Sequence, residues 1–344
     1  MNETKQTNAA HEPTGQIVPV YLLTGFLGSG KTTLLNRLAA DARERGLKLA
    51  VLLNEVGDVN VEAELLGGDV PMAAMLGGCI CCQLRGDVAM ELSRIVREHK
   101  PDVVWIESTG VAQPLDMMDG VAEASLYERV ALRGVVTVVD ARHLLDRLRV
   151  GAGRTLKLMI EQIRAASTLV LNKIDLIGSA EREELMDALS GWNERARILV
   201  SERADVSVST LYDDDGSMSS HVNTHGPHCD EHCEHDHHHD EATEPHRHRM
   251  HDHVNALTHY LQGPIDSREF ERFLSKLPEG VYRAKGIVTF TDTTGRFLFQ
   301  YAYRESDFLR ITPQGTVHDV AVFIGEGFSE HELIAELDKL IARL

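Results

Sequence analysis

The sequence predicts an α/β fold in which a mostly parallel sheet is flanked by helices, followed by a small α+β domain. Three observations lead to this prediction. Short apolar runs alternate with amphipathic stretches up to about residue 206, the composition then changes sharply, and strand and helix patterns resume near Ala256. Apolar strands that alternate with helices are typical of βαβ units around a buried parallel sheet.

The chain of 344 residues is longer than one typical core requires, so we expect more than one domain. The composition predicts four segments: a disordered N-terminal tail at 1–16, an α/β domain at 17–206, a His-rich flexible linker at 207–255 and an α+β domain at 256–344.

The expected elements follow from hydrophobic periodicity. In the first domain the apolar runs predict strands at 18–24, 49–53, 103–106, 135–139 and 169–171, with helices between them such as 31–45 and 87–99. In the last domain we expect a helix at 266–277, strands at 282–291, 296–303 and 318–324, a turn at Thr294-Gly295, and a closing helix at 329–344.

The charge balance excludes some partners. There are 35 Lys and Arg against 53 Asp and Glu, a net charge of −18 with His neutral. Such an acidic chain is a poor general binder of nucleic acid or of an anionic membrane surface, so we expect neither partner. No apolar run is long enough to span a membrane, and residues 1–16 lack the apolar centre of a signal peptide. We therefore expect a cytoplasmic protein whose five Cys are thiols rather than a disulfide framework.

A phosphate-binding motif follows the first predicted strand. Residues 25–32 read G-F-L-G-S-G-K-T, which fits G-x-x-x-x-G-K-S/T between a strand and a helix, so we expect a P-loop NTPase domain. The glycines let backbone N–H groups curl around phosphates, Lys31 reaches the β- and γ-phosphates, and the Thr32 hydroxyl binds Mg²⁺. The expected nucleotide-binding residues of this loop are Gly25, Gly28, Ser29, Gly30, Lys31, Thr32 and Thr33. The alternative is a chance glycine-rich turn, which the flanking strand and helix disfavour.

A guanine-reading motif ends the strand predicted at 169–171. The tetrapeptide Asn172-Lys173-Ile174-Asp175 fits N-K-x-D. The Asp175 carboxylate can accept hydrogen bonds from N1 and N2 of guanine, a donor pair that adenine lacks, and the stem of Lys173 can pack along the base. Alone this motif could be a helix cap, but downstream of a phosphate loop it favours GTP over ATP.

The predicted strand at 103–106 ends in Glu107-Ser108-Thr109-Gly110. We expect Glu107 to act in catalysis with Lys31, by holding Mg²⁺ through water or by positioning the attacking water, and the Gly110 N–H to contact the γ-phosphate. The alternative is that Glu107 only caps the next helix.

Three thiols lie close together in the run Cys79-Ile80-Cys81-Cys82. Such a loop suits a soft ion such as Zn²⁺ or Cu(I), and an incomplete ligand shell suits transfer of the metal. The alternatives are Cys residues packed under a turn, or a strained disulfide between Cys81 and Cys82. Because nucleotide-sensing switch segments occur in this part of P-loop GTPases, the metal affinity could depend on the nucleotide.

Together these motifs resemble the CobW-like family of metal-handling P-loop GTPases, over nearly the whole chain after residue 16. The resemblance implies a slow GTPase that delivers zinc, and sometimes cobalt or iron, to a client metalloprotein, with metal bound by Cys79, Cys81 and Cys82. It also implies a CobW-type C-terminal domain. Related sequences often read E-N-E-F-G-E where residues 53–58 here read L-N-E-V-G-D. Asp58 is therefore the first candidate for a further metal ligand, and Glu55 the second.

The segment between the two domains carries twelve of the eighteen His residues, interleaved with acids. Many imidazoles without a fixed frame predict several weak, exchangeable metal ions, although for any single His a solvated linker is the simpler interpretation. The expected ligands are His225, His228, Cys229, His232, Cys233, His235, His237, His238 and His239.

The sequence thus predicts a GTPase metallochaperone that uses GTP, Mg²⁺ and Zn²⁺, or Co²⁺ in place of zinc. Its partners would be a client protein and GTP or GDP, and a homo-oligomer is left open. Two alternatives stay open as well: a non-catalytic zinc buffer, and a cobalt-handling accessory of cobalamin synthesis.

Overall fold

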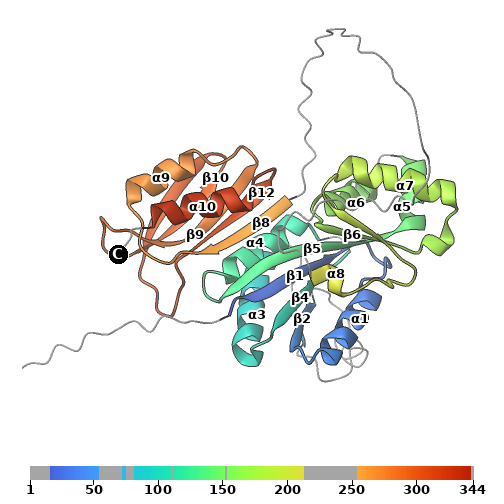
Figure 1. Cartoon of the computed structure of the whole chain (residues 1–344), viewed down its shortest axis with the longest axis horizontal. Coiled ribbons are helices and arrows are strands. Elements are labelled where there is room, and N and C mark those ends of the chain that lie inside the picture. Colours follow the sequence, from blue (N-terminus) through green and yellow to red (C-terminus); the bar gives the residue numbers. More distant parts are fainter. Residues whose placement is uncertain are drawn as a thin grey trace, which may run out of the picture.

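A computed structural model of the chain describes residues 16–53, 72–74, 81–110, 112–151, 153–212 and 254–341 (Figure 1). For residues 72–74 and 81–85 only the backbone is considered. Two sheets organise these residues, one of seven strands and one of five. The α/β and α+β architecture expected from the sequence is confirmed.

The larger sheet is parallel throughout, in the order β3-β2-β4-β1-β5-β6-β7. Its strands are β1 (Val18–Thr24), β2 (Leu49–Leu53), β3 (Met72–Ala74), β4 (Val103–Glu107), β5 (Val130–Asp140), β6 (Thr168–Asn172) and β7 (Arg197–Val200). The helices around it are α1 (Lys31–Glu44), α3 (Cys81–His99), α4 (Pro114–Ala124), α5 (Ala141–Val150), α6 (Arg154–Arg164), α7 (Ser179–Trp192) and α8 (Ser209–Tyr212), with a 3₁₀ turn η1 (Ile174–Leu176).

Alternation along β1 divides the core between the two faces of this sheet. Val20 and Leu22 point to the face covered by α3 and α4, whereas Tyr21 and Leu23 point to the face covered by α1 and α8. All four side chains are at most 5% exposed. Because both faces are covered by helices, the strands are apolar on both sides, which explains the continuous apolar runs of the sequence.

The strand order makes the carboxyl ends of β1, β4 and β5 a topological switch point of the sheet. The strand β1 lies between β4 and β5, so successive connections leave it on opposite sides. In open α/β sheets, ligands bind outside the carboxyl ends of the strands at such a switch point. The loops after β1, β4, β5 and β6 meet there.

The smaller sheet is antiparallel, in the order β11-β10-β9-β12-β8. Its strands are β8 (Val254–Tyr260), β9 (Val281–Thr289), β10 (Arg296–Ala302), β11 (Glu305–Ile311) and β12 (Val320–Glu326). The helices α9 (Ser267–Ser275) and α10 (Glu330–Leu340) pack on one face, around the fully buried rings of Phe270, Phe299 and Phe323.

The other face of the smaller sheet packs on α3 and α4, so that α4 lies between the two sheets (Figure 1). Tyr260 anchors this contact: its hydroxyl accepts a hydrogen bond from Val130 N at 2.9 Å and lies 2.9 Å from the carbonyl oxygens of Glu128 and Val130. Arg129 lies over its ring, with Cζ 4.7 Å from the centroid. Burial raises the pKa of Tyr260 far above its ordinary range, so the hydroxyl stays protonated and can donate.

Ion pairs tie α4 to β9. Arg283 pairs with Asp119, and Lys285 Nζ lies 2.8 Å from Glu123 Oε2 and 3.0 Å from the Asp119 carbonyl oxygen. The helix that follows the Glu107–Gly110 loop therefore holds the C-terminal sheet by both charge and apolar contact.

Two described elements, α8 and β8, lie at the edges of the predicted linker. The helix α8 packs Leu211 into the first domain and sets Tyr212 against Tyr21, at 5.5 Å between ring centroids. The strand β8 starts at Val254. The divisions at 206/207 and 255/256 stay predictions, and most of the linker lies outside the described residues.

Candidate functional site

The loop between β1 and α1 is shaped by left-handed glycines. Gly25, Gly28 and Gly30 have φ angles of 133°, 75° and 113°. A Cβ on Gly30 would lie 2.5 Å from Asn172 Nδ2, so a side chain has neither the conformation nor the space it needs there. The loop is thus curled as an anion cradle requires, with the N-terminus of α1 below it.

Two polar side chains of this loop are buried. Lys31 Nζ donates to the Gly25 carbonyl at 3.0 Å, which holds the ammonium across the loop. The Ser29 hydroxyl is buried and has no hydrogen-bond partner among the described residues, so a ligand oxygen in the cradle could satisfy it. Thr32 and Thr33 follow Lys31 in the first turn of α1. The arrangement of these residues fits a bound phosphate chain.

The loop after β4 lies directly on the phosphate loop. A Cβ on Gly110 would lie 2.6 Å from Leu27 N, so only glycine allows this approach. Gln162 of α6 donates from Nε2 to the Gly110 carbonyl at 3.2 Å. Glu107, the last residue of β4, is buried beside Leu23 of β1. A carboxylate and a backbone N–H are therefore placed next to the cradle.

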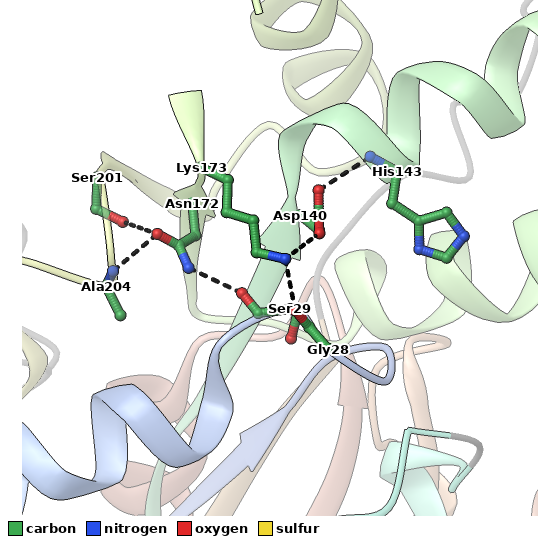
Figure 2. A network of polar contacts seen from close by, with 8 residues as sticks. All are labelled: Gly28, Ser29, Asp140, His143, Asn172, Lys173, Ser201 and Ala204. Carbon is green, nitrogen blue, oxygen red and sulfur yellow. Dashed lines mark hydrogen bonds and ion pairs between the residues drawn. The ribbon is translucent and has the colours of Figure 1, made fainter. Parts of the chain in front are cut away.

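Asn172, the last residue of β6, joins two loops (Figure 2). Its Nδ2 donates to the Ser29 carbonyl at 2.8 Å. Its Oδ1 accepts from Ala204 N at 2.8 Å and from Ser201 Oγ at 3.2 Å. Ala204 has a φ of 54°, which is unusual for a residue with a side chain and is held by this bond. The phosphate loop and the loop after β7 are thus fixed to the same amide.

Lys173 continues this network toward α5 (Figure 2). Its Nζ donates to the Gly28 carbonyl at 2.7 Å and lies 2.6 Å from Asp140 Oδ2. Asp140 in turn caps α5, because His143 N donates to its other oxygen at 2.9 Å. The ring of His143 lies 5.1 Å from that of Phe26 in the phosphate loop.

Asp175 lies in the 3₁₀ turn after Lys173 and is exposed. Its carboxylate forms no hydrogen bond or ion pair with another described residue. Its acceptor positions are therefore open toward solvent, as base recognition by a carboxylate requires.

The structure brings together the predicted phosphate, base and Glu107–Gly110 residues, and places only part of the predicted metal ligands. Cys81 and Cys82 are the first two residues of α3, although their side chains are not described. Cys79, Asp58, Glu55 and the His tract lie outside the described residues. In the part of the chain that the structure describes, no three His, Cys, Asp or Glu side chains converge to hold a metal ion. Nor does any described helix have the length and apolar character needed to cross a bilayer.

The sequence interpretation missed four residues of this site: Asp140, Gln162, Ser201 and Ala204. Asp140 could have been found, because a carboxylate directly after an apolar strand lies at the ligand-binding edge of a parallel sheet. Gln162 is one side chain of α6, and Ser201 and Ala204 lie in the irregular loop after β7. No periodic pattern in the sequence marks any of these three residues.

Both domains of this chain match models of known protein families. Residues 19–200 match the family model of the CobW/HypB/UreG nucleotide-binding domain, and residues 254–341 match that of the cobalamin synthesis protein cobW C-terminal domain. The zinc chaperone YjiA of Escherichia coli is 29% identical over 334 residues, covering 92% of this chain and 97% of YjiA.

Another relative matches over a smaller part of its own length. The zinc-regulated GTPase metalloprotein activator 1 of Dictyostelium discoideum is 29% identical over 231 residues, and the match covers 56% of this chain and 48% of that protein.

The crystal structure of Zn(II)-bound YjiA GTPase from E. coli superposes with a TM-score of 0.45 at 24% identity, over 95% of this chain and 100% of that one.

Proposed function

Because this chain belongs to the CobW/HypB/UreG family of nucleotide-binding proteins, we propose that it is a GTP-hydrolysing metallochaperone which delivers zinc to a client protein. The names of its relatives, a zinc chaperone and a zinc-regulated metalloprotein activator, support this assignment. The proposal divides the chain into a GTPase domain, a metal-gathering linker and a C-terminal domain that engages the client.

GTP would bind with its phosphates in the loop of residues 25–32 and its base at the loop of residues 172–175. Lys31, held 3.0 Å from the Gly25 carbonyl, would exchange this contact for the β- and γ-phosphates. Asp175, open to solvent, would accept from N1 and N2 of guanine. Asn172 would act indirectly, by fixing the phosphate loop to the loop after β7.

Hydrolysis would use Glu107 and Gly110. The Glu107 carboxylate, buried at the end of β4, would orient the attacking water, and the Gly110 N–H would contact the γ-phosphate. Thr32 and Glu107 offer the hard oxygen donors that Mg²⁺ prefers, and this ion would neutralise phosphate charge when bound. The rate should be slow, because no arginine is among the residues assigned to the γ-phosphate.

Zinc is the cargo in this proposal, held by Cys79, Cys81 and Cys82 with Asp58 as the first further candidate. The observation that carries the proposal is the packing of α3, which begins with Cys81 and Cys82, on α4. Val88 and Leu92 of α3 share a buried cluster with Met117 and Val121 of α4. Since α4 begins four residues after Gly110, a shift in the γ-phosphate loop would be transmitted to the helix that carries the thiols.

Client recognition would use the groove between the two domains. This groove has a volume of about 680 Å³ and is lined by Met90 of α3, Glu123 of α4 and Tyr303 beside β10. Met90 is 64% exposed and Tyr303 is 94% exposed. Methionine and aromatic side chains are enriched in protein interfaces. The groove starts along the same helix as the thiols, so a client bound there would be close to the metal.

The proposal is tested by measuring GTP turnover and metal content together. We expect slow hydrolysis that changes when Zn²⁺ is added, and a zinc stoichiometry that falls when Cys79, Cys81 and Cys82 are replaced by Ser. A zinc buffer would instead show negligible hydrolysis and would lose its metal only when residues 221–253 are deleted. Selective Co²⁺ binding by the thiols would favour the cobalt alternative.

A further inference from the structure

Asp140 lies where three parts of the nucleotide site meet. It is the last residue of β5 and the N-cap of α5, and its two oxygens have different partners (Figure 2). Oδ1 accepts from His143 N at 2.9 Å, and Oδ2 lies 2.6 Å from Lys173 Nζ. The side chain is only 12% exposed, so water competes little with either contact. One carboxylate therefore joins the end of β5 and the start of α5 to the base-reading loop.

Lys173 has an unusual backbone conformation, and its side chain is held by these contacts. Its φ of 61° is left-handed, which a residue with a Cβ rarely adopts. Its ammonium is shared between the Asp140 carboxylate and the Gly28 carbonyl of the phosphate loop. A lysine side chain has four rotatable bonds and loses much entropy when it is fixed. With only the neutral carbonyl as a partner, the ammonium would leave this position more often.

We propose that Asp140 is a positioning residue for the nucleotide base: it holds the stem of Lys173 flat along the face of guanine and binds the lysine to the phosphate loop. This inference rests on the proposed GTP site. Asp140 touches no part of the nucleotide itself and acts only through Lys173. It lies outside the phosphate, base-reading and Glu107–Gly110 motifs of the sequence.

The substitution Asp140→Asn separates this role from helix capping. Asn and Asp are equally good N-caps, so the bond from His143 N is kept. The volume is unchanged, but the charge that pairs with Lys173 is lost. We expect GDP to dissociate faster and to bind about tenfold more weakly, equivalent to ~1.4 kcal/mol. Asp140→Ala, which also loses the cap, should in addition lower the midpoint of urea unfolding.

The sign of the change distinguishes positioning from simple electrostatics. Removal of a carboxylate near the phosphate loop reduces its repulsion of the nucleotide phosphates, so by charge alone Asp140→Asn would tighten GDP binding, most at low salt. The positioning role predicts weaker binding at every salt concentration. Tighter or unchanged binding in fluorescence titrations with GDP would overturn the proposal.

A second readout uses the base. The face of the base is the same in GDP and IDP, whereas IDP lacks the N2 group that Asp175 is expected to read. Asp140→Asn should weaken GDP and IDP by the same factor and leave their affinity ratio unchanged, whereas Asp175→Ala should remove most of the preference for GDP. A changed ratio in Asp140→Asn would show that Asp140 reads the base edge, against the proposal.

The matched control is Asp146→Asn on the same helix. Asp146 forms an exposed ion pair with Arg142, four residues earlier, whereas the ion pair of Lys173 is with Asp140. It should bind GDP like the wild type. If the wild-type chain binds no guanine nucleotide, the proposed function itself fails. If wild type binds GDP and Asp140→Asn binds it equally well, only the positioning role fails.

Discussion

Replacement of Asn172 by Ala removes one amide that two loops share. The lost contacts are the donation from Nδ2 to Ser29 and the two bonds that Oδ1 accepts, from Ala204 N and Ser201 Oγ. Asn172 is 1% exposed and Ala204 is fully buried, so water cannot replace the missing acceptor without a movement of the loop. The change therefore leaves a buried N–H without a partner.

The magnitude follows from these bonds. A buried donor without an acceptor costs ~1–3 kcal/mol, and each lost ordinary hydrogen bond ~0.5–1.5 kcal/mol. We expect Asn172→Ala to lower the free energy of unfolding by about 3 kcal/mol. Because the Ser29 carbonyl is released as well, the phosphate loop loses its fixed shape, and GDP should bind at least about tenfold more weakly.

Asn193→Ala is the matched control, because Asn193 is an equally buried amide in the same domain whose hydrogen bonds involve no residue of the phosphate loop. Its Nδ2 donates to the Ile163 and Ala166 carbonyls, both at 2.8 Å, and its Oδ1 accepts from Ala196 N at 2.9 Å. Urea unfolding should show similar destabilisation in both variants, whereas GDP titration of the folded proteins should show weakened binding only in Asn172→Ala. Equal GDP affinity in the two variants would refute the reasoning.

Three further substitutions test other parts of the structure. Gly30→Ala should abolish GDP binding in titrations, because its Cβ would lie 2.5 Å from Asn172 Nδ2 at a φ of 113°. Tyr260→Phe should lower the free energy of urea unfolding by about 2 kcal/mol, because the buried hydroxyl loses its hydrogen bonds with Val130 N and with the Glu128 carbonyl. The pKa of His318 is lowered from 6.5 by burial and by nearby Arg side chains, so the unfolded chain binds its proton more readily. Stability should therefore fall as the pH drops from ~7 to ~5, and His318→Gln should reduce that fall in urea titrations at each pH.

Two matched variants separate these effects from general strain. Tyr303→Phe removes a hydroxyl from a 94% exposed ring and should leave stability unchanged. Gly46→Ala introduces strain at a φ of 68° with no atom nearby, and should leave GDP affinity unchanged. The interpretation of Tyr260 fails if Tyr260→Phe is as stable as Tyr303→Phe. The interpretation of Gly30 fails if Gly46→Ala binds GDP as poorly as Gly30→Ala. If the stability of His318→Gln falls with pH as much as that of wild type, the interpretation of His318 is contradicted.

The sequence predicted the α/β domain well because its signals are local. The apolar run at 18–24 matches β1 at both ends, since a strand buried on both faces must be apolar throughout. The phosphate and base motifs were found because their residues are contiguous. By contrast, β11 was missed: it is an exposed edge strand in which charged residues interrupt any apolar pattern.

The candidate site was less predictable where it depends on long-range contacts. The bonds of Asn172 to Ala204 and of Lys173 to Asp140 join residues about thirty positions apart, and no sequence period encodes them. The ion pairs between α4 and β9 join residues more than 160 positions apart, and they follow only from the packing of two domains. The thiol ligands, Asp58 and the His tract stay predictions of the sequence alone.

The central claim is that the nucleotide state changes how tightly the thiols hold zinc. The most direct test is zinc affinity, measured by competition with a chromogenic chelator, for the full chain loaded with a non-hydrolysable GTP analogue or with GDP. We predict dissociation constants that differ by about tenfold, and a difference that disappears when Cys81 and Cys82 are replaced by Ser. Equal zinc affinity in the two nucleotide states would contradict the claim.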